Sequence, residues 1–264
     1  MRKTLVQTIL AAFCAILCVT SSVGGDGMNR RRILAGLGAH TPTAKDYVQD
    51  GLIAMWDGIE NAGWGVHDPN ATVWKDLSGN GYDFNLTQHA TILDDSVEGD
   101  GQGVIGDFNY DIVKTPLTIE VCAFDYLKKN TTLEIIGTKF GWGCYYGSMN
   151  SARTNSVIFF IGNRSPDYTK FDGQCFCAIN SEDFGSLVYI NGAKAMDVKD
   201  YIGGKSYIAK SGITTIGGVK NLASSGYGRF LTGRILYLRL YEREFTIDEI
   251  AANYAVDKAR FNLT

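Results

Sequence analysis

The clearest structural signal in this sequence is a β-prone run that ends in a turn, Ser186-Leu187-Val188-Tyr189-Ile190-Asn191-Gly192-Ala193. Asn followed by Gly readily supplies the two positive φ angles that a type I′ turn needs. The branched and aromatic residues before the pair favour an extended strand. The stretch therefore predicts a tight hairpin between two antiparallel strands.

The same pattern extends in both directions from this hairpin. From about Tyr47 onward, short apolar or aromatic segments alternate with clusters of Gly, Asn and Asp. The further strands that this pattern predicts cover residues 52–56, 72–75, 117–124, 133–138, 157–161, 174–179, 213–216 and 233–241. Such a rhythm is typical of an antiparallel sandwich. The acid-rich stretch 94–100 is interpreted as a solvated loop between strands.

One helix is well marked, near the C-terminus. Thr246 and Glu249 have the spacing of a capping box, in which each side chain bonds the other residue's backbone amide. The apolar positions that follow are Ile247, Ile250, Ala251, Tyr254 and Ala255. This helical spacing predicts one face that packs on the sandwich and a helix that ends near Lys258.

The composition excludes several classes of protein. The 264 residues suit one large β domain and a short leader. A net charge of -3 argues against a nucleic-acid partner, because phosphate binding requires a concentrated excess of Lys and Arg. Only 3 His are present, so the composition does not favour an enzyme that relies on catalytic histidines.

The N-terminus has the pattern of a signal peptide. Basic residues precede an apolar run from about Leu5 to Val19, and small residues follow it. The run is shorter than the roughly 20 residues of a membrane-spanning helix. We expect a signal peptide over 1–24, a linker over 25–45 and a domain over 46–264. The protein is then exported, without a stable membrane span after cleavage.

Removal of such a leader would leave four cysteines, Cys122, Cys144, Cys175 and Cys177. An exported protein can oxidise them, and four cysteines allow three pairings. Cys175 and Cys177 share one face of a predicted strand and cannot easily pair with each other. Buried free thiols and a single disulfide both remain open.

Several segments together carry a family resemblance. They are residues 51–57 (GLIAMWD), 73–83 (VWKDLSGNGYD), 188–192 (VYING), 230–235 (FLTGRI) and 238–243 (LRLYER), followed by the C-terminal helix. In this order they resemble a laminin G-like domain of the concanavalin A-like lectin and glucanase superfamily. The resemblance implies an all-β jelly-roll sandwich of two antiparallel sheets with one short C-terminal helix.

The resemblance also implies a function, because such domains in bacteria and phages often sit on surface or tail proteins. We expect a module that binds a carbohydrate or another cell-surface ligand, with homo-oligomerisation or display supplying avidity. One alternative is a structural or assembly domain, such as part of a phage fibre, without a ligand. A second alternative is a divergent glycoside hydrolase.

Catalysis lacks support in the sequence, so we expect that the protein is not an enzyme. Hydrolases in this superfamily carry Glu-x-Asp-x-x-Glu on one strand, and that string is absent. No Gly-x-Ser-x-Gly elbow is present either. A divergent hydrolase would need acids from separate strands, such as Glu120, Asp125 and Glu134.

Exposed aromatic residues are the candidate ligand contacts, because sugar rings stack on Trp and Tyr. Trp142, Tyr145 and Tyr146 lie among glycines in residues 140–147. Core packing is the competing interpretation for these three, since alternating strand residues bury one set. Trp64 lies in a loop, where it either contacts ligand or covers the end of the sandwich. Trp56 and Trp74 are expected in the core.

Calcium is the cofactor that the resemblance implies. Relatives often bind Ca²⁺ between the opening segment and the closing strand, and Asp57, Asp76 and Asn80 are the matching oxygen-bearing residues. The closing strand has Leu236 and Tyr237 where relatives frequently carry acids. The competing interpretation is that Asp76 and Asn80 cap a tight turn.

Overall fold

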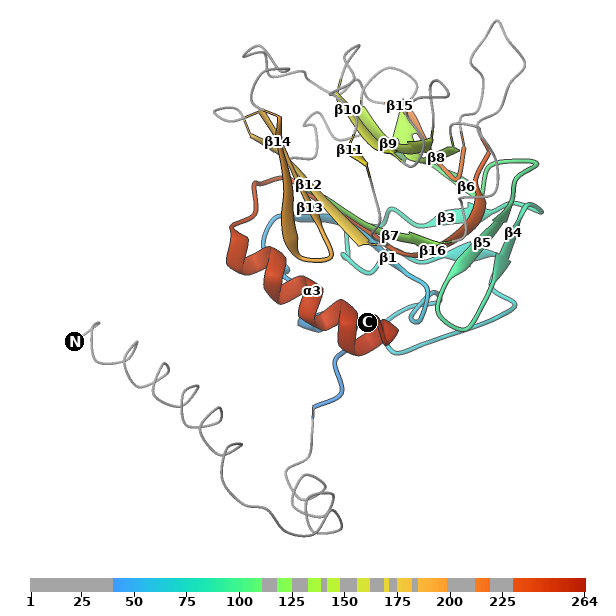
Figure 1. Ribbon diagram of the computed structural model, residues 1–264. Coiled ribbons are helices and arrows are strands. Elements are labelled where there is room, and N and C mark those ends of the chain that lie inside the picture. The colour runs from blue at the N-terminus through green and yellow to red at the C-terminus, as the bar shows by residue number, and fades with distance from the viewer. Residues whose placement is uncertain are drawn as a thin grey trace, which may run out of the picture. The chain divides into compact units, whose positions relative to one another are not determined.

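The strands form two antiparallel sheets that pack against each other, and a C-terminal helix covers the outer face of one of them (Figure 1). The computed structural model describes residues 40–110, 118–124, 133–138, 142–147, 156–161, 169–170, 175–181, 185–198, 212–218 and 230–264. These strands and the helix lie in the compact unit Pro42–Thr264. The predicted all-β sandwich with one C-terminal helix is confirmed.

The helix-side sheet has the strand order β14-β13-β12-β7-β16-β5-β4, with β1 also paired to β16. Its strands are β1 (Leu52–Asp57), β4 (Ala90–Ile92), β5 (Val97–Asp100), β7 (Thr118–Phe124), β12 (Cys175–Ser181), β13 (Gly185–Ile190), β14 (Ala193–Val198) and β16 (Thr232–Tyr241). The opposite sheet has the order β11-β10-β9-β8-β15-β6-β3-β2. Its strands are β2 (Val73–Trp74), β3 (Phe84–Leu86), β6 (Gly106–Tyr110), β8 (Leu133–Thr138), β9 (Trp142–Gly147), β10 (Ser156–Ile161), β11 (Thr169–Lys170) and β15 (Gly212–Ile216).

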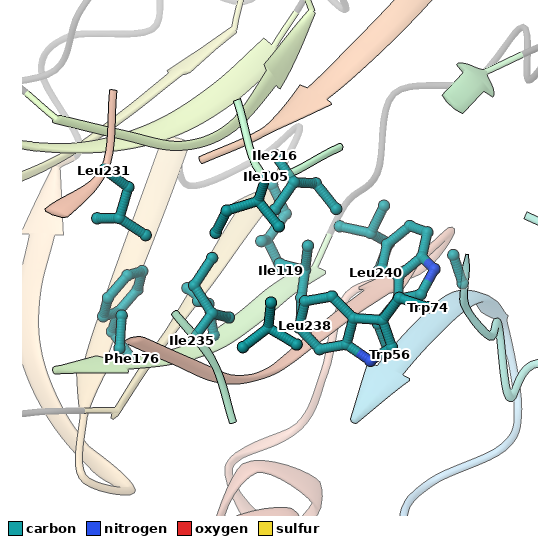
Figure 2. Packing of buried hydrophobic residues seen from close by; sticks show 14 of the residues in the cluster. Trp56, Trp74, Ile105, Ile119, Phe176, Ile216, Leu231, Ile235, Leu238 and Leu240 are labelled. Atoms are coloured by element: carbon teal, nitrogen blue, oxygen red, sulfur yellow. The ribbon is translucent and has the colours of Figure 1, made fainter. Parts of the chain in front are cut away.

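The main core lies between the two sheets (Figure 2). Trp56 and Trp74 are both fully buried there, as expected, and each ring lies against Phe84. The helix-side sheet supplies residues at alternate positions of its central strands, including Ile119, Val121, Ile235, Leu238 and Leu240. Alternation along a strand sends the intervening residues to the other face.

That other face is buried as well, because the helix α3 (Ile247–Phe261) packs over it. Strand β7 is consequently buried at six successive positions, with Glu120 on the helix side between residues that face the main core. Strand β16 bulges at Leu236, so that Leu236 and Tyr237 both face the helix side while Ile235 and Leu238 face the core. The bulge sets which residues of β16 meet the helix.

Two local predictions from the sequence, the hairpin turn and the helix cap, are confirmed. Asn191 and Gly192 have φ angles of 48° and 75° and join β13 to β14. Helix α3 begins after Thr246 with both bonds of the capping box. It ends at Phe261, beyond the expected end near Lys258. Asn262 terminates the helix there, because it adopts the left-handed conformation and donates its backbone N–H to the Lys258 carbonyl.

The acid-rich stretch 94–100 is only partly a loop, since Val97–Asp100 forms β5. Val97 and Gly99 are buried while Glu98 and Asp100 are exposed, so the charges occupy the outward positions of a strand. At the N-terminal side, the short 3₁₀ helix η2 (Ala44–Asp46) and the buried Tyr47 precede β1. Within the described ranges, no helix has the length and apolar character to cross a membrane.

Candidate ligand-binding surface

Trp64 lies at the tip of a tight turn between β1 and β2. Gly63 and Val66 form an isolated antiparallel bridge, in which the Val66 amide donates to the Gly63 carbonyl over 2.9 Å. Trp64 is 38% exposed and Val66 is 50% exposed. The turn therefore presents an aromatic and an apolar side chain to solvent, in contrast to the buried Trp56 and Trp74.

Buried side chains hold the base of this turn. Glu60 is 6% exposed and accepts the Gly65 amide at 2.8 Å through one oxygen. Its other oxygen accepts the Ala44 amide at 3.0 Å and an Arg260 guanidinium N–H at 2.9 Å. Asn61, which is fully buried, exchanges two hydrogen bonds with the Asp68 backbone. Trp64 is thus displayed from a turn that is anchored at both ends.

Lys45 is a member of this surface that sequence reasoning missed. Its Nζ atom lies 5.3 Å from the centroid of the Trp64 ring. Lys45 belongs to η2, whose capping box joins Thr43 and Asp46, although the sequence places it in the expected linker. The Thr-x-x-Asp spacing was the available sign that residues 43–46 are ordered. The contact with Trp64 itself has no local signature.

Asp57, a predicted calcium ligand, is instead a buried partner of the helix. It is 0% exposed, and Arg260 of α3 donates to both of its carboxylate oxygens. The same carboxylate accepts the amides of Ile59 and Glu60 at 3.0 Å each. Burial raises the pKa of the Asp57 carboxyl, and Arg260 opposes that rise.

A second buried ion-pair cluster lies beside the first. Arg239 donates to Glu120 at 2.8 Å and makes two bonds, of 2.8 and 2.9 Å, to Asp257. Its guanidinium carbon lies 3.9 Å from the centroids of both the Tyr47 and Tyr237 rings. Although burial alone would lower it, the pKa of Arg239 is raised well above its ordinary value by Asp257 and Glu120. This cluster links α3 to strands β7 and β16 of the helix-side sheet.

Asp76 and Asn80, the other two predicted calcium ligands, pin a turn to β1. Asp76 accepts the amides of Met55, Ser78 and Tyr82 at 2.9–3.0 Å. The amide nitrogen of Asn80 donates to the Ile53 carbonyl at 2.8 Å. These are the turn-capping contacts of the competing interpretation.

Calcium needs six to eight oxygen ligands free to face the ion. As folded, the oxygens of Asp57 and Asp76 face N–H donors, and Arg260 places a guanidinium beside Asp57. Across the described ranges, no group of three or more His, Cys, Asp or Glu side chains is arranged to hold a metal ion. The donor set therefore does not fit a calcium site in this arrangement, and calcium binding stays an untested prediction.

The remaining predicted ligand contacts lie on β9, an interior strand of the opposite sheet. Positions 145 and 146 pair with Ile158 and Val157 of β10, and position 142 pairs with Ile161. Because alternate positions of a strand share a face, positions 142 and 146 lie on one face and 145 on the other. Trp142, Tyr145 and Tyr146 therefore do not occupy a single face, and their role in binding stays a prediction.

The acids proposed for a divergent hydrolase lie on different elements. Glu120 is 4% exposed under the helix, where it bonds Arg239 and Asn253. Glu134 lies on β8 of the opposite sheet, and Asp125 lies outside the described residues. Burial raises the pKa of the Glu120 carboxyl, against the opposing effect of Arg239.

Among the residues that the structure describes, one pair of cysteines is oxidised. Cys122 of β7 and Cys175 of β12 are directly opposite each other and form a disulfide. Cys177 is a buried free thiol, and Cys144 lies on β9. Between the two joined cysteines the chain makes four strands of the opposite sheet, β8 to β11, before it returns. The disulfide therefore joins the points where the chain leaves and re-enters the helix-side sheet.

Comparison with known proteins gives similarity in structure and not in sequence. No protein-family model and no curated protein sequence match the chain. A solved structure of Trypanosoma rangeli sialidase in complex with sialic acid matches 85% of this chain with a TM-score of 0.55 and 18% identity. The binding domain of botulinum neurotoxin DC, solved with rat synaptotagmin II, matches 81% with a TM-score of 0.51 and 14% identity.

The similarity is one of fold. A structure described as a receptor binding domain also matches, with a TM-score of 0.53 and 15% identity over 80% of this chain. The chain spans about 35% of the sialidase and about half of each binding-domain chain. The similar structures thus include both enzymes and domains that bind receptors.

This finding corrects one expectation. The chain was expected not to be an enzyme, because known hydrolase motifs are absent from it. The comparison contradicts that expectation, since several of the similar structures are sialidases and one is a mutant with trans-sialidase activity. The absence of sequence motifs known from other hydrolases did not anticipate this similarity. At 16–18% identity over about a third of the enzyme, the similarity assigns no catalytic residue to this chain.

Proposed function

We propose that this domain is a lectin-like, glycan-binding module of the concanavalin A-like, laminin G-like kind, with Trp64 as its central ligand contact. The observation that carries the proposal is the exposure of Trp64 on a turn whose base is held by buried Glu60 and Asn61. An indole offers a flat apolar face and an N–H donor, which together suit a sugar ring. Such a residue costs less entropy on binding when its backbone is already fixed.

The similar structures support a binding role without naming a ligand for this chain. One is a sialidase solved with sialic acid, and another is a toxin binding domain solved with rat synaptotagmin II. We favour a glycan over a protein partner, because the exposed apolar surface at the turn consists of only two large side chains, Trp64 and Val66. A protein interface of ordinary size buries roughly 800 Å² on each partner.

Export is part of the proposal. The Cys122–Cys175 disulfide supports it, since disulfides persist in oxidising compartments and are rare in the cytosol. The pattern of residues 1–24 supports it independently. A displayed or oligomeric form would convert weak single sites into useful avidity.

A glycan array probed with multivalent protein tests the proposal. Wild-type protein should bind a defined set of glycans, and Trp64→Ala should abolish that binding while leaving the unfolding midpoint nearly unchanged, because the residue is exposed. Val66→Ala is the matched control on the same turn and should weaken binding only a fewfold. A blank array with folded wild-type protein, or full binding by Trp64→Ala, would contradict the proposal.

A further inference from the structure

Lys45 carries a charge that the fold does not neutralise. Its described contacts are the Trp64 ring, whose centroid lies 5.3 Å from Nζ, and the Thr43 hydroxyl oxygen, which accepts the Lys45 backbone N–H at 3.3 Å. Within the described part of the chain, no carboxylate lies within ion-pair distance of its ammonium. Lys45 is exposed, so the ammonium is available to a ligand seated on Trp64.

The acids near this lysine along the chain or under the turn are already engaged. Glu60 pairs with Arg260 at 2.9 Å and accepts two backbone amides from inside the fold. Asp46 accepts the Thr43 amide at 2.7 Å within the capping box. Asp68 accepts the Asn70 amide at 2.8 Å. None of these described contacts involves the Lys45 ammonium, which is exposed beside the Trp64 ring and can meet a ligand there.

We propose that the Trp64 turn selects carboxylate-bearing sugars, with Lys45 as the residue that confers this preference. The inference rests on the proposed function and specifies the ligand class of the same site. A sugar stacked by its C–H face on the indole meets an apolar surface, whereas a carboxylate at its edge meets a mobile ammonium. A neutral sugar gains only the first of these interactions.

The energetics favour transfer of the ammonium from the ring to a carboxylate. An exposed cation–π contact is weak, while a hydrogen bond between an ammonium and a carboxylate is charge-assisted and stronger. The four-carbon stem of lysine lets the ammonium move without a change in the backbone. Because the pair would be exposed to solvent, the preference should be modest and should decrease as salt is added.

The experiment is a titration of the full chain with four monosaccharides by ligand-observed NMR. N-acetylneuraminic acid and glucuronic acid are the two carboxylate sources, and their methyl esters are the neutral counterparts. Wild-type protein should bind at least one acid about two- to fivefold more tightly than its ester, as expected for an exposed ion pair. Lys45→Met should abolish that ratio while retaining ester binding, and Lys45→Arg should preserve it. The difference between the two acids identifies the source of the carboxylate.

The outcomes separate this inference from the proposed function. Equal binding of acids and esters by wild type would refute the inference and leave a neutral-sugar site. An unchanged ratio in Lys45→Met would refute the role of Lys45 in the preference. Binding of an acidic peptide with no sugar binding would refute both, as would no binding by folded protein. Loss of all sugar binding in Lys45→Met and in Lys45→Arg would also refute it, because selectivity requires that ester binding survive.

Discussion

Arg239 of β16 and Asp257 of α3 form a two-bond ion pair, at 2.8 and 2.9 Å, that is almost completely buried between sheet and helix. The same guanidinium also bonds Glu120 of β7. Strand β7, whose Glu120 is 119 positions away from Arg239, therefore meets the consecutive elements β16 and α3 at one charge. A charge removed from water requires partners on every side, so each member of the cluster depends on the others.

Asp257→Asn should lower the free energy of unfolding by about 3 kcal/mol or more, because it leaves Arg239 buried with only one carboxylate. Urea denaturation measures the change. Asp248→Asn, at an exposed position on the first turn of the same helix, is the control and should cost less than about 1 kcal/mol. Equal effects of the two substitutions would show that the buried pair has no special importance.

Loss of the Cys122–Cys175 disulfide should destabilise the domain by about 4 kcal/mol, as estimated from the entropy of a loop of this length. The double variant Cys122→Ala/Cys175→Ala tests this value in urea. Wild-type protein should lose stability when a reductant is added, whereas the double variant should not respond. Peptide mapping without reduction should recover the cross-linked pair, and its absence would disprove the assignment.

The N-terminal cap of α3 should contribute to acid sensitivity. Hydrogen bonds from Arg243 hold the pKa of Glu249 at about 2, below its ordinary value of 4.5. The stability that its ionised form supplies is fully present above pH 4.5 and is lost as the pH falls toward 2.

Glu249→Gln should therefore cost up to about 1 kcal/mol at pH 7, since the pair with Arg243 is partly exposed. It should also flatten the fall in unfolding free energy between pH 4.5 and 2. Urea titrations at several pH values provide the measurement. Glutamine keeps one oxygen that can accept the Thr246 amide, whereas its NH2 group replaces an oxygen that accepts from Arg243, so the substitution removes the charge together with one Arg243 bond. An unchanged acid slope would contradict the assigned pKa.

The turn held by Asp76 should depend on its carboxylate and not on a metal ion. Asp76→Ala leaves three backbone amides without their acceptor and should cost about 2–3 kcal/mol. Millimolar Ca²⁺ should leave the thermal midpoint of wild-type protein unchanged relative to EDTA, because the oxygens already face N–H donors. A Ca²⁺-dependent rise that disappears in Asp76→Ala would reverse this conclusion and establish the calcium site.

The correct parts of the sequence analysis rest on short-range chemistry. The Asn191-Gly192 turn and the Thr246 cap each involve residues at most three positions apart, and their backbone preferences act before any tertiary contact forms. The burial of Trp56 and Trp74 followed from their places in β-prone segments. Export rested on the signal-peptide pattern of residues 1–24, whereas calcium binding rested on the family resemblance.

The candidate site could be predicted only in part from the sequence. Trp64 could be identified from its loop context, but its partner Lys45 lies in a segment that composition describes as a linker. The disulfide partners likewise could not be predicted from the spacing of the cysteines, which left three pairings open. Only the register of β7 against β12 brings Cys122 opposite Cys175.

The sequence by itself determined an antiparallel β sandwich, its β13–β14 hairpin and a capped C-terminal helix, because alternation, turn chemistry and capping are local properties of the chain. Tertiary structure alone decided the partners of the buried charges. The bulge at Leu236 breaks the alternation of β16 and turns Tyr237 and Arg239 toward the helix. Contacts of this kind depend on strand register and on elements some two hundred residues apart, as in the pair of Asp57 with Arg260. Local preferences contain no information about them.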